Sequence, residues 1–179
     1  MSFWKWIGLD GVPAAREPEG VDRLEHALGG MDPAKARYLA CFAYILTRSA
    51  RADHEVTDGE AREMQRIVVE QGGLPTELAA TLIELARKEA LRSGGTEDFI
   101  VTREFNRLAT REQKLALLDA LFAVSGVDES ILTVEDNEIR RVANELTLEH
   151  ADYIAVRARH RANLAVMQDK SKNGPKARY

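Results

Sequence analysis

Two acidic segments hold the side chains of this chain that are best suited to chemistry. Carboxylate oxygens are the hard ligands that Ca²⁺ and Mg²⁺ prefer in proteins. The first segment contributes Asp53, Glu55, Asp58 and Glu60, and the second contributes Asp128, Glu129 and Glu135. The sequence therefore predicts a possible divalent-cation site, with calcium or magnesium as the cofactor, built from these seven residues.

The two segments are copies of one pattern. Shifting the chain by 75 positions superimposes Asp53 on Asp128 and Glu60 on Glu135. The same shift also superimposes Val56 on Ile131, Glu63 on Glu138, Met64 on Ile139, Arg66 on Arg141 and Ile67 on Val142. Because two helical hairpins can bury their apolar faces against each other, the pattern predicts a duplicated helix–turn–helix unit.

The same carboxylates have a purely structural interpretation. Thr57 and Glu60 have the spacing of a capping box, and residues 133–136 read as a second one. Carboxylates in a first helical turn are also stabilised by the helix dipole. Capping and cation binding do not exclude each other. An EF-hand is excluded, because a loop beginning at Asp53 would place Met64 where the bidentate glutamate is required.

Apolar residues recur at helical spacing through most of the chain, and no segment shows the alternation of a strand. Helices are expected over about 33–51, from 57 to before 72, from 75 to 94, over about 96–108, after a capping box at Thr110 and Gln113, over about 133–146, and over about 148–168. The last one places Ile154, Ala158, Ala162 and Ala165 on one face.

These elements predict an all-α fold: a compact bundle of about seven to eight helices with an internal pseudo-two-fold repeat of helical hairpins. The helical domain is expected over residues 21–169, with repeat halves at about 33–94 and 110–168. An aromatic segment and linker occupy 1–20, and a flexible basic tail occupies 170–179.

Composition narrows the function. A net charge of −4 argues against nucleic acid as a partner. The single cysteine, Cys41, lies in an apolar run and is expected in the core. No apolar segment is long enough to span a membrane, so the cytoplasm is the expected compartment.

Motifs of known enzymes are missing, so we expect a binding protein rather than an enzyme. A metal-dependent hydrolase using the acidic turns is the alternative.

The four histidines lack ligand spacing and are expected at the surface: His26, His54, His150 and His160. A basic patch of Arg157, Arg159, His160 and Arg161 is expected to be solvated, or to contact an acidic partner.

An aromatic cluster near the start of the sequence comprises Phe3, Trp4, Trp6 and Ile7. It either folds back onto the domain, or it docks on a partner groove or a membrane surface, which would make the protein a peripheral membrane adaptor. A protein partner is expected, but its identity does not follow from the sequence.

Residues 49–60, echoed by residues 123–135, resemble the tellurite-resistance TerB family, and the likeness extends over about residues 30–168. The resemblance implies an all-helical fold with an internal repeat, a divalent-metal site, and a role in stress response or as a co-chaperone-like interaction module, with links to membrane-associated complexes. The positions that match the family motif are Asp53, Glu60, Asp128 and Glu135. The family glycine after each aspartate is His54 in the first copy and Glu129 in the second.

Overall fold

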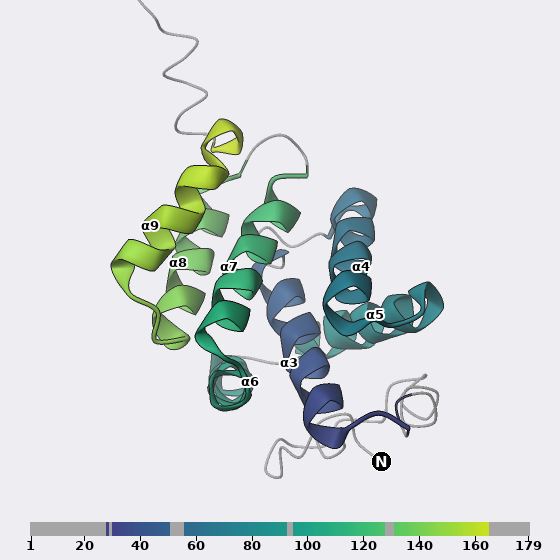
Figure 1. The fold of residues 1–179 in the computed structure, drawn as a ribbon. Coiled ribbons are helices and arrows are strands. Elements are labelled where there is room, and N and C mark those ends of the chain that lie inside the picture. Colours follow the sequence, from purple (N-terminus) through teal and green to yellow (C-terminus); the bar gives the residue numbers. More distant parts are fainter. Residues whose placement is uncertain (1–27, 29, 51–55, 93–94, 128–130, 165–179) are drawn as a thin grey trace, which may run out of the picture.

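The computed structural model describes residues 28, 30–50, 56–92, 95–127 and 131–164. Over these residues the chain is all-α, as predicted, and none of them belongs to a β-strand. The elements are α3 (Pro33–Ala50), α4 (Asp58–Gly72), α5 (Thr76–Arg92), α6 (Gly95–Leu108), α7 (Arg111–Ser125), α8 (Thr133–Glu145), α9 (His150–Arg159) and the 3₁₀-helix η2 (Arg161–Asn163) (Figure 1). Among them, no helix is long and apolar enough to cross a membrane.

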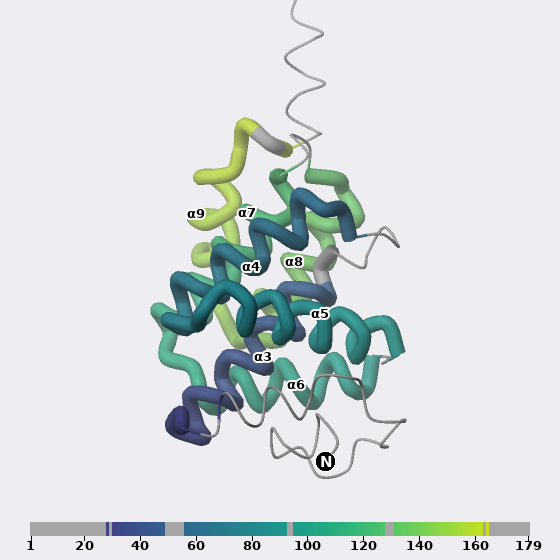
Figure 2. Tube along the Cα trace, turned by 90° about the vertical axis from the view of Figure 1, so that its right-hand side faces the viewer, coloured from purple at the N-terminus to yellow at the C-terminus, as the bar shows by residue number. Residues whose placement is uncertain are grey.

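Helices α3 and α7 lie side by side in the centre of the bundle (Figure 1). α4 and α5 pack on one side of this pair, while α8 and α9 pack on the other. α6 crosses below and contacts both α3 and α8, and Figure 2 shows that α5 and α6 flank α3. The bundle is therefore organised around α3.

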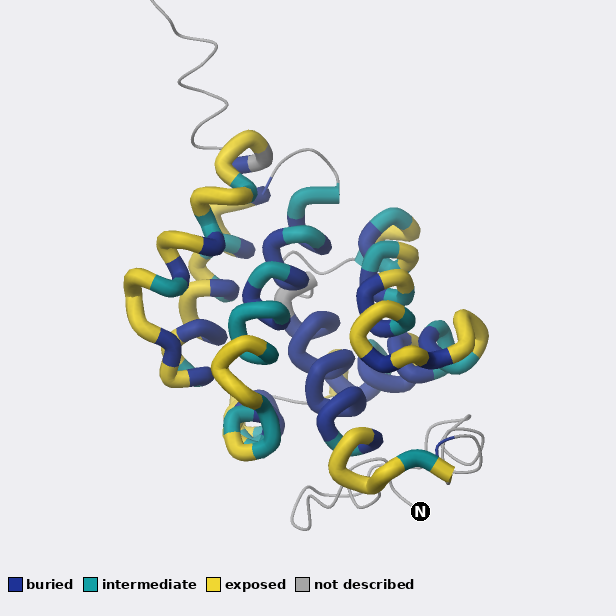
Figure 3. The backbone as a smooth tube through the Cα atoms, viewed as in Figure 1, coloured by how far each residue is buried: buried dark blue, intermediate teal, exposed yellow. Residues whose placement is uncertain are grey.

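The sequence of α3 explains its central place. Residues 38–48 are all buried, so the helix is covered on every side along this stretch (Figure 3). Residues 38–46 are apolar or aromatic around the whole circumference of the helix, and a helix of this kind is stable when it is buried in a core. Tyr38 and Phe42 of α3 pack with Phe105 of α6, with ring centroids 5.2–6.2 Å apart. Cys41 is fully buried, as predicted, and burial raises the pKa of its thiol.

The described helices follow the predicted repeat. α3 and α4 recur as α7 and α8 at the 75-residue shift, and α5 recurs as α9 after the loss of one residue. The residue that turns the chain out of the second helix is left-handed in both copies: Gly73 has φ 64° and Thr147 has φ 57°. Glycine adopts this conformation freely, whereas a β-branched residue is strained there. α6 has no counterpart among the residues that the structure describes, and it connects the two copies.

The prediction of the last helix was wrong in the length of the helix and in the face that it buries. α9 ends at Arg159 rather than near residue 168. Its buried side chains are Tyr153 and Val156, while Ile154 is 46% exposed. Ala158 and Ala162 are exposed too, and Ala165 lies outside the described residues. The larger side chains on the neighbouring face bury more apolar area than the alanines, so that face docks against the bundle.

Candidate functional site

Three of the seven predicted ligands fall within the described residues. Asp58 is the exposed first residue of α4. Glu60 and Glu135 occupy the first turns of α4 and α8 and are only 5% and 3% exposed. The other four, Asp53, Glu55, Asp128 and Glu129, lie outside the described residues.

Glu60 caps the helix that contains it. Its Oε2 accepts a hydrogen bond from the backbone N–H of Thr57 at 2.8 Å, while its own N–H donates to Thr57 Oγ1 at 3.1 Å. This is the predicted capping box, in which two backbone donors at the start of α4 are satisfied reciprocally.

Glu135 makes the corresponding bond in the second copy, but the predicted box was placed one residue too late. Its Oε2 accepts from the N–H of Leu132 at 2.7 Å, so Leu132 is the cap and Thr133 is already helical. Leu132 takes the place of Thr57 in the repeat and has no side-chain acceptor. The reciprocal half of the box is therefore missing in α8.

A third cap shows what the carboxylates add. At the start of α7, Gln113 accepts from the N–H of Thr110 at 2.8 Å, and its own N–H donates to Thr110 Oγ1 at 3.3 Å. A neutral amide thus makes the same cap in this molecule. A cap of this kind therefore does not require a carboxylate.

The described part of the chain brings together no group of three His, Cys, Asp or Glu side chains that could hold a metal ion. Glu60 and Glu135 belong to different turns, and Asp58 points into solvent at the surface of α4. The cation site therefore depends on the predicted ligands outside the described ranges, and it stays a prediction.

A buried ion cluster around Arg48 was not predicted. Arg48 of α3 is 1% exposed, and its guanidinium reaches carboxylates of α8. Nε donates to Glu138 Oε1 at 2.8 Å, and the two terminal nitrogens donate to the two oxygens of Glu145 at 2.7 and 3.0 Å. A bidentate pair of this kind is among the stronger and more directional protein ion pairs.

α6 completes the cluster. Asp98 Oδ2 lies 3.6 Å from Arg48 Nε, and Asp98 Oδ1 accepts from the hydroxyl of Tyr44 at 2.8 Å. Thr102 Oγ1 lies 3.2 Å from Arg48 Nη1. The cluster thus joins α3 of the first copy, the connecting helix and α8 of the second copy.

The charges of the cluster shift its pKa values. Burial alone lowers the pKa of Arg48, but the hydrogen bond with Glu145 and the charges of Glu138 and Asp98 raise it overall. Burial alone raises the pKa of Glu145, but the hydrogen bond and charge of Arg48 lower it overall. Both groups are therefore held in their charged forms.

The same charge triad occurs on α4, where the described residues offer it no buried partner. Arg66 binds Glu63 at 2.6 Å and Glu70 at 2.5 Å, all on the surface of one helix. On α8, Arg141 binds Glu138 at 3.2 Å and Glu145 at 3.4 Å. The position of Arg48 is taken in the second copy by Ala123, which cannot supply a charge to α4.

A signal for Arg48 was present in the sequence. It follows Tyr44 by four residues and Ile45 by three, so helical periodicity places it on the buried side of α3. A charged residue at a core position is rarely buried without a partner. Its partners were not predictable, because they lie about 50 to 97 residues away along the chain.

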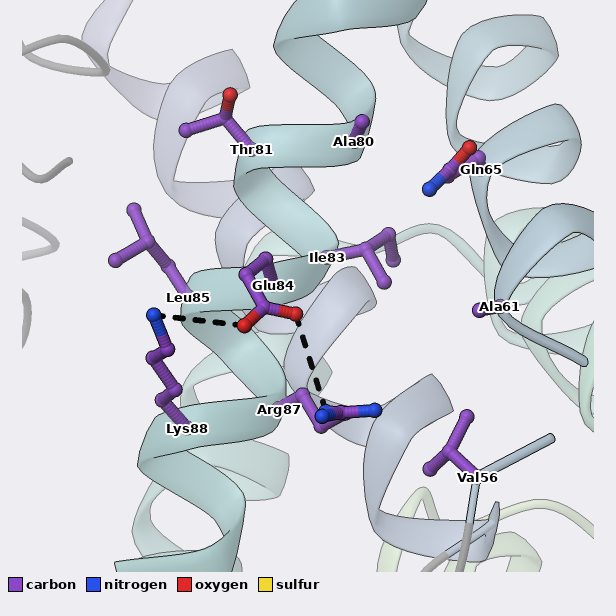
Figure 4. A pocket seen from close by; sticks show the side chains of 10 residues that line it. All are labelled: Val56, Ala61, Gln65, Ala80, Thr81, Ile83, Glu84, Leu85, Arg87 and Lys88. Carbon is purple, nitrogen blue, oxygen red and sulfur yellow. Dashed lines mark ion pairs between the residues drawn. The ribbon is translucent and has the colours of Figure 1, made fainter. Parts of the chain in front are cut away.

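A groove of about 730 Å³ lies between α4 and α5 (Figure 4). Its lining comprises Val56, Ala61, Gln65, Ala80, Thr81, Ile83, Glu84, Leu85, Arg87 and Lys88. Glu84 is the one carboxylate of this lining and pairs with Lys88 at 3.4 Å and Arg87 at 3.9 Å. The groove thus does not gather the paired carboxylates that a metal-dependent hydrolase would use.

An ion pair bridges the corresponding crossing in the second copy. Asp136, at the place of Ala61, accepts from the Tyr153 hydroxyl at 2.6 Å and from Arg157 Nη2 at 2.8 Å. Arg157 takes the place of Ile83. Charged side chains thus pair across α8 and α9 at positions where α4 and α5 have the apolar Ala61 and Ile83.

The predicted basic patch is partly paired. Besides Arg157, Arg159 reaches Asp119 at 3.3 Å. His160 was wrongly predicted at the surface: its side chain is 16% exposed, and its ring stacks on Phe122 with centroids 5.5 Å apart. Its Nε2 lies 3.1 Å from the same Asp119 oxygen. His150 is exposed as predicted, whereas His26 and His54 lie outside the described residues.

Fold and site together define an all-helical domain made of a duplicated three-helix unit, with a buried carboxylate in the same cap position of each copy. The family described as tellurite resistance protein TerB matches residues 38–158, which is well over half of the chain. The chain belongs to the TerB family. Comparison with curated proteins and with solved structures gave no match.

Proposed function

We propose that this TerB-family domain is an interaction module that binds a divalent cation, calcium or magnesium, at its two acidic turns and organises a surface for a protein partner there. The observation that carries the proposal is that both copies place a buried carboxylate, Glu60 or Glu135, at the same cap position. The cap of α7 forms with the neutral Gln113 in this role, so capping does not require a carboxylate.

Carboxylate oxygens are the ligands that Ca²⁺ and Mg²⁺ prefer in proteins, and each copy places a buried carboxylate at the same position. Asp53 and Asp128, seven residues before the two glutamates, are the further ligands of the proposal, together with Glu55, Asp58 and Glu129. The helix dipole favours the same charges, and only a metal titration separates the two causes.

The decisive experiment measures the melting temperature with and without millimolar Ca²⁺ or Mg²⁺. A cation that binds only the folded state adds about 2.7 kcal/mol of stability at a hundredfold excess over Kd. The variant with Glu60→Gln and Glu135→Gln keeps both caps, because glutamine accepts the same N–H. We expect its metal-free melting temperature to stay close to that of the wild type, and its metal-dependent increase to be lost.

Gln113→Glu is the matched control, since it places a carboxylate in the third cap without a neighbouring acidic turn. It should leave the response to metal unchanged. A wild-type melting temperature that does not move at millimolar cation would contradict the proposal. An equal increase in the wild type and in the double glutamine variant would locate the cation elsewhere.

Membership of the TerB family extends the proposal to a stress response of the tellurite-resistance type in the cytoplasm. A pull-down with the full chain as bait, with and without chelator, tests whether a protein partner depends on the cation. Peripheral membrane contact through Phe3, Trp4, Trp6 and Ile7 is a separate part of the proposal. Deleting residues 1–8 should abolish sedimentation with liposomes if that contact exists.

A further inference from the structure

Two exposed apolar side chains stand at the start of α8. Leu132 is 42% exposed and Val134 is 47% exposed, although both belong to the first turn of an otherwise polar helix surface. Leu132 also replaces a residue type that could cap the helix, which costs about 1 kcal/mol relative to threonine. The second copy thus carries apolar surface here at the expense of helix stability.

The first copy has no such surface. Thr57 and Gly59 occupy the places of Leu132 and Val134, and Thr57 caps α4 with its side chain. The difference between the copies follows the path of the chain. α5 continues past the corresponding point to Arg92, whereas the helix of the second copy gives way to an extended residue at Leu164.

Leu164 brings the outgoing chain directly to this surface. It forms an isolated parallel β-bridge with Ile131, the residue before Leu132. Both partners of the bridge are buried, with exposures of 2% and 1%. Because the bridge is parallel, the chain that leaves Leu164 runs in the same direction as the chain that enters α8.

The residues after Leu164 are apolar like the surface beside them, and the chain is long enough to reach it. Ala165, Val166 and Met167 are apolar, and the following segment is polar, with a charge of +3 from four basic residues and Asp169. In an extended segment Val166 shares the face of Leu164 and lies about 7 Å beyond it. The first turn of α8 rises about 5 Å over the same direction.

We propose that residues 165–167 continue from the bridge along the first turn of α8, and that Val166 covers Leu132 and Val134. The chain's own C-terminal segment is then the occupant of this surface, and its basic remainder is held at the start of α8. The contact does not depend on the proposed cation.

Disulfide formation in the full chain tests the contact. We would pair Val134→Cys with Val166→Cys and measure the effective concentration of the two thiols in a glutathione buffer. Cysteines bridge only where their Cα atoms lie about 4.4–6.8 Å apart. Cys41 does not interfere, because it is fully buried and its thiol pKa is raised.

The control pairs Gly59→Cys with the same Val166→Cys, because Gly59 is the equivalent position of the first copy. We expect an effective concentration at least tenfold higher for the Val134 pair. Equal values for the two pairs would overturn the proposal. Concentration-dependent disulfide dimers in place of the intramolecular bond would overturn it in favour of a second copy as the occupant.

A second measurement avoids cysteine. Val166→Asp should release the segment and increase the rate of trypsin cleavage after Lys170 severalfold, while Ala177→Asp, beyond the contact, should not. Equal cleavage rates in the wild type and in Val166→Asp would also overturn the proposal.

Discussion

Helices α4 and α8 carry the same charged triad and use it differently. On α4, Glu63, Arg66 and Glu70 pair with each other at the surface. On α8 the two glutamates of the triad, Glu138 and Glu145, bind the buried Arg48 as well. Local sequence is shared, so the difference arises from the helix that each triad faces.

The comparison shows that the contribution of an ion pair to the free energy of unfolding depends on its surroundings more than on the residues that form it. Exposed pairs contribute about 0–1 kcal/mol, because water and salt screen them. A buried guanidinium that loses its partners, or carboxylates that lose theirs, leaves an uncompensated charge in the core. The α8 triad thus takes part in ion pairs that connect three helices, while the pairs of the α4 triad lie within one helix.

The largest expected effect comes from Arg48. Arg48→Met leaves Asp98, Glu138 and Glu145 without their buried cation and should lower the free energy of unfolding by about 3–5 kcal/mol. Arg66→Met, its exposed counterpart, should change it by less than about 1 kcal/mol. Urea unfolding at pH 7 measures both. Similar losses for the two variants would remove the distinction between the triads.

A smaller effect is expected at Glu145, and it should depend on pH. Glu145→Gln should cost about 1–3 kcal/mol at pH 7, as charged hydrogen bonds do, and Glu70→Gln about 0.5 kcal/mol or less. The pKa of Glu145 is lowered in the folded protein from its ordinary value of 4.5, because Arg48 outweighs the effect of burial. Its contribution is therefore complete above that value and is lost as the pH falls through the lowered pKa.

Unfolding free energies of the wild type and of Glu145→Gln should thus differ by a constant amount between pH 7 and about pH 5.5, and converge in more acidic solution. A gap that widens on acidification would contradict the ion pair as its cause.

For Glu63, a hydrogen bond from Arg66 lowers the pKa as well, but this pair is exposed. Its contribution should therefore disappear in about 1 M salt.

The smallest effect concerns the left-handed turns that end the second helix of each copy. Thr147→Gly should stabilise the protein by about 1 kcal/mol, because glycine removes the strain of a positive φ. Gly73→Ala should destabilise it by about as much, for the converse reason. Thermal unfolding distinguishes the two directions. A loss of stability in Thr147→Gly would show that the threonine side chain outweighs the strain.

The all-α class, the order of the helices and the repeat were predictable because they depend on local patterns. Apolar periodicity, the caps of α4 and α7, and the 75-residue shift are each readable within a few turns of helix. The last helix was predicted poorly because the choice between its two apolar faces depends on which neighbours it meets. Tyr153 and Val156 are buried, whereas Ala158 and Ala162 are exposed.

The sequence by itself determined that two equivalent acidic segments exist and that a glutamate caps the helix after the first, since capping involves residues only three positions apart. Only the tertiary structure decided that Glu60 and Glu135 are buried, that Arg48 binds three carboxylates, and that a groove opens between α4 and α5. The reason is physical: burial and long-range ion pairs depend on which helices meet, and side chains 50 or more residues apart come together only when the bundle packs.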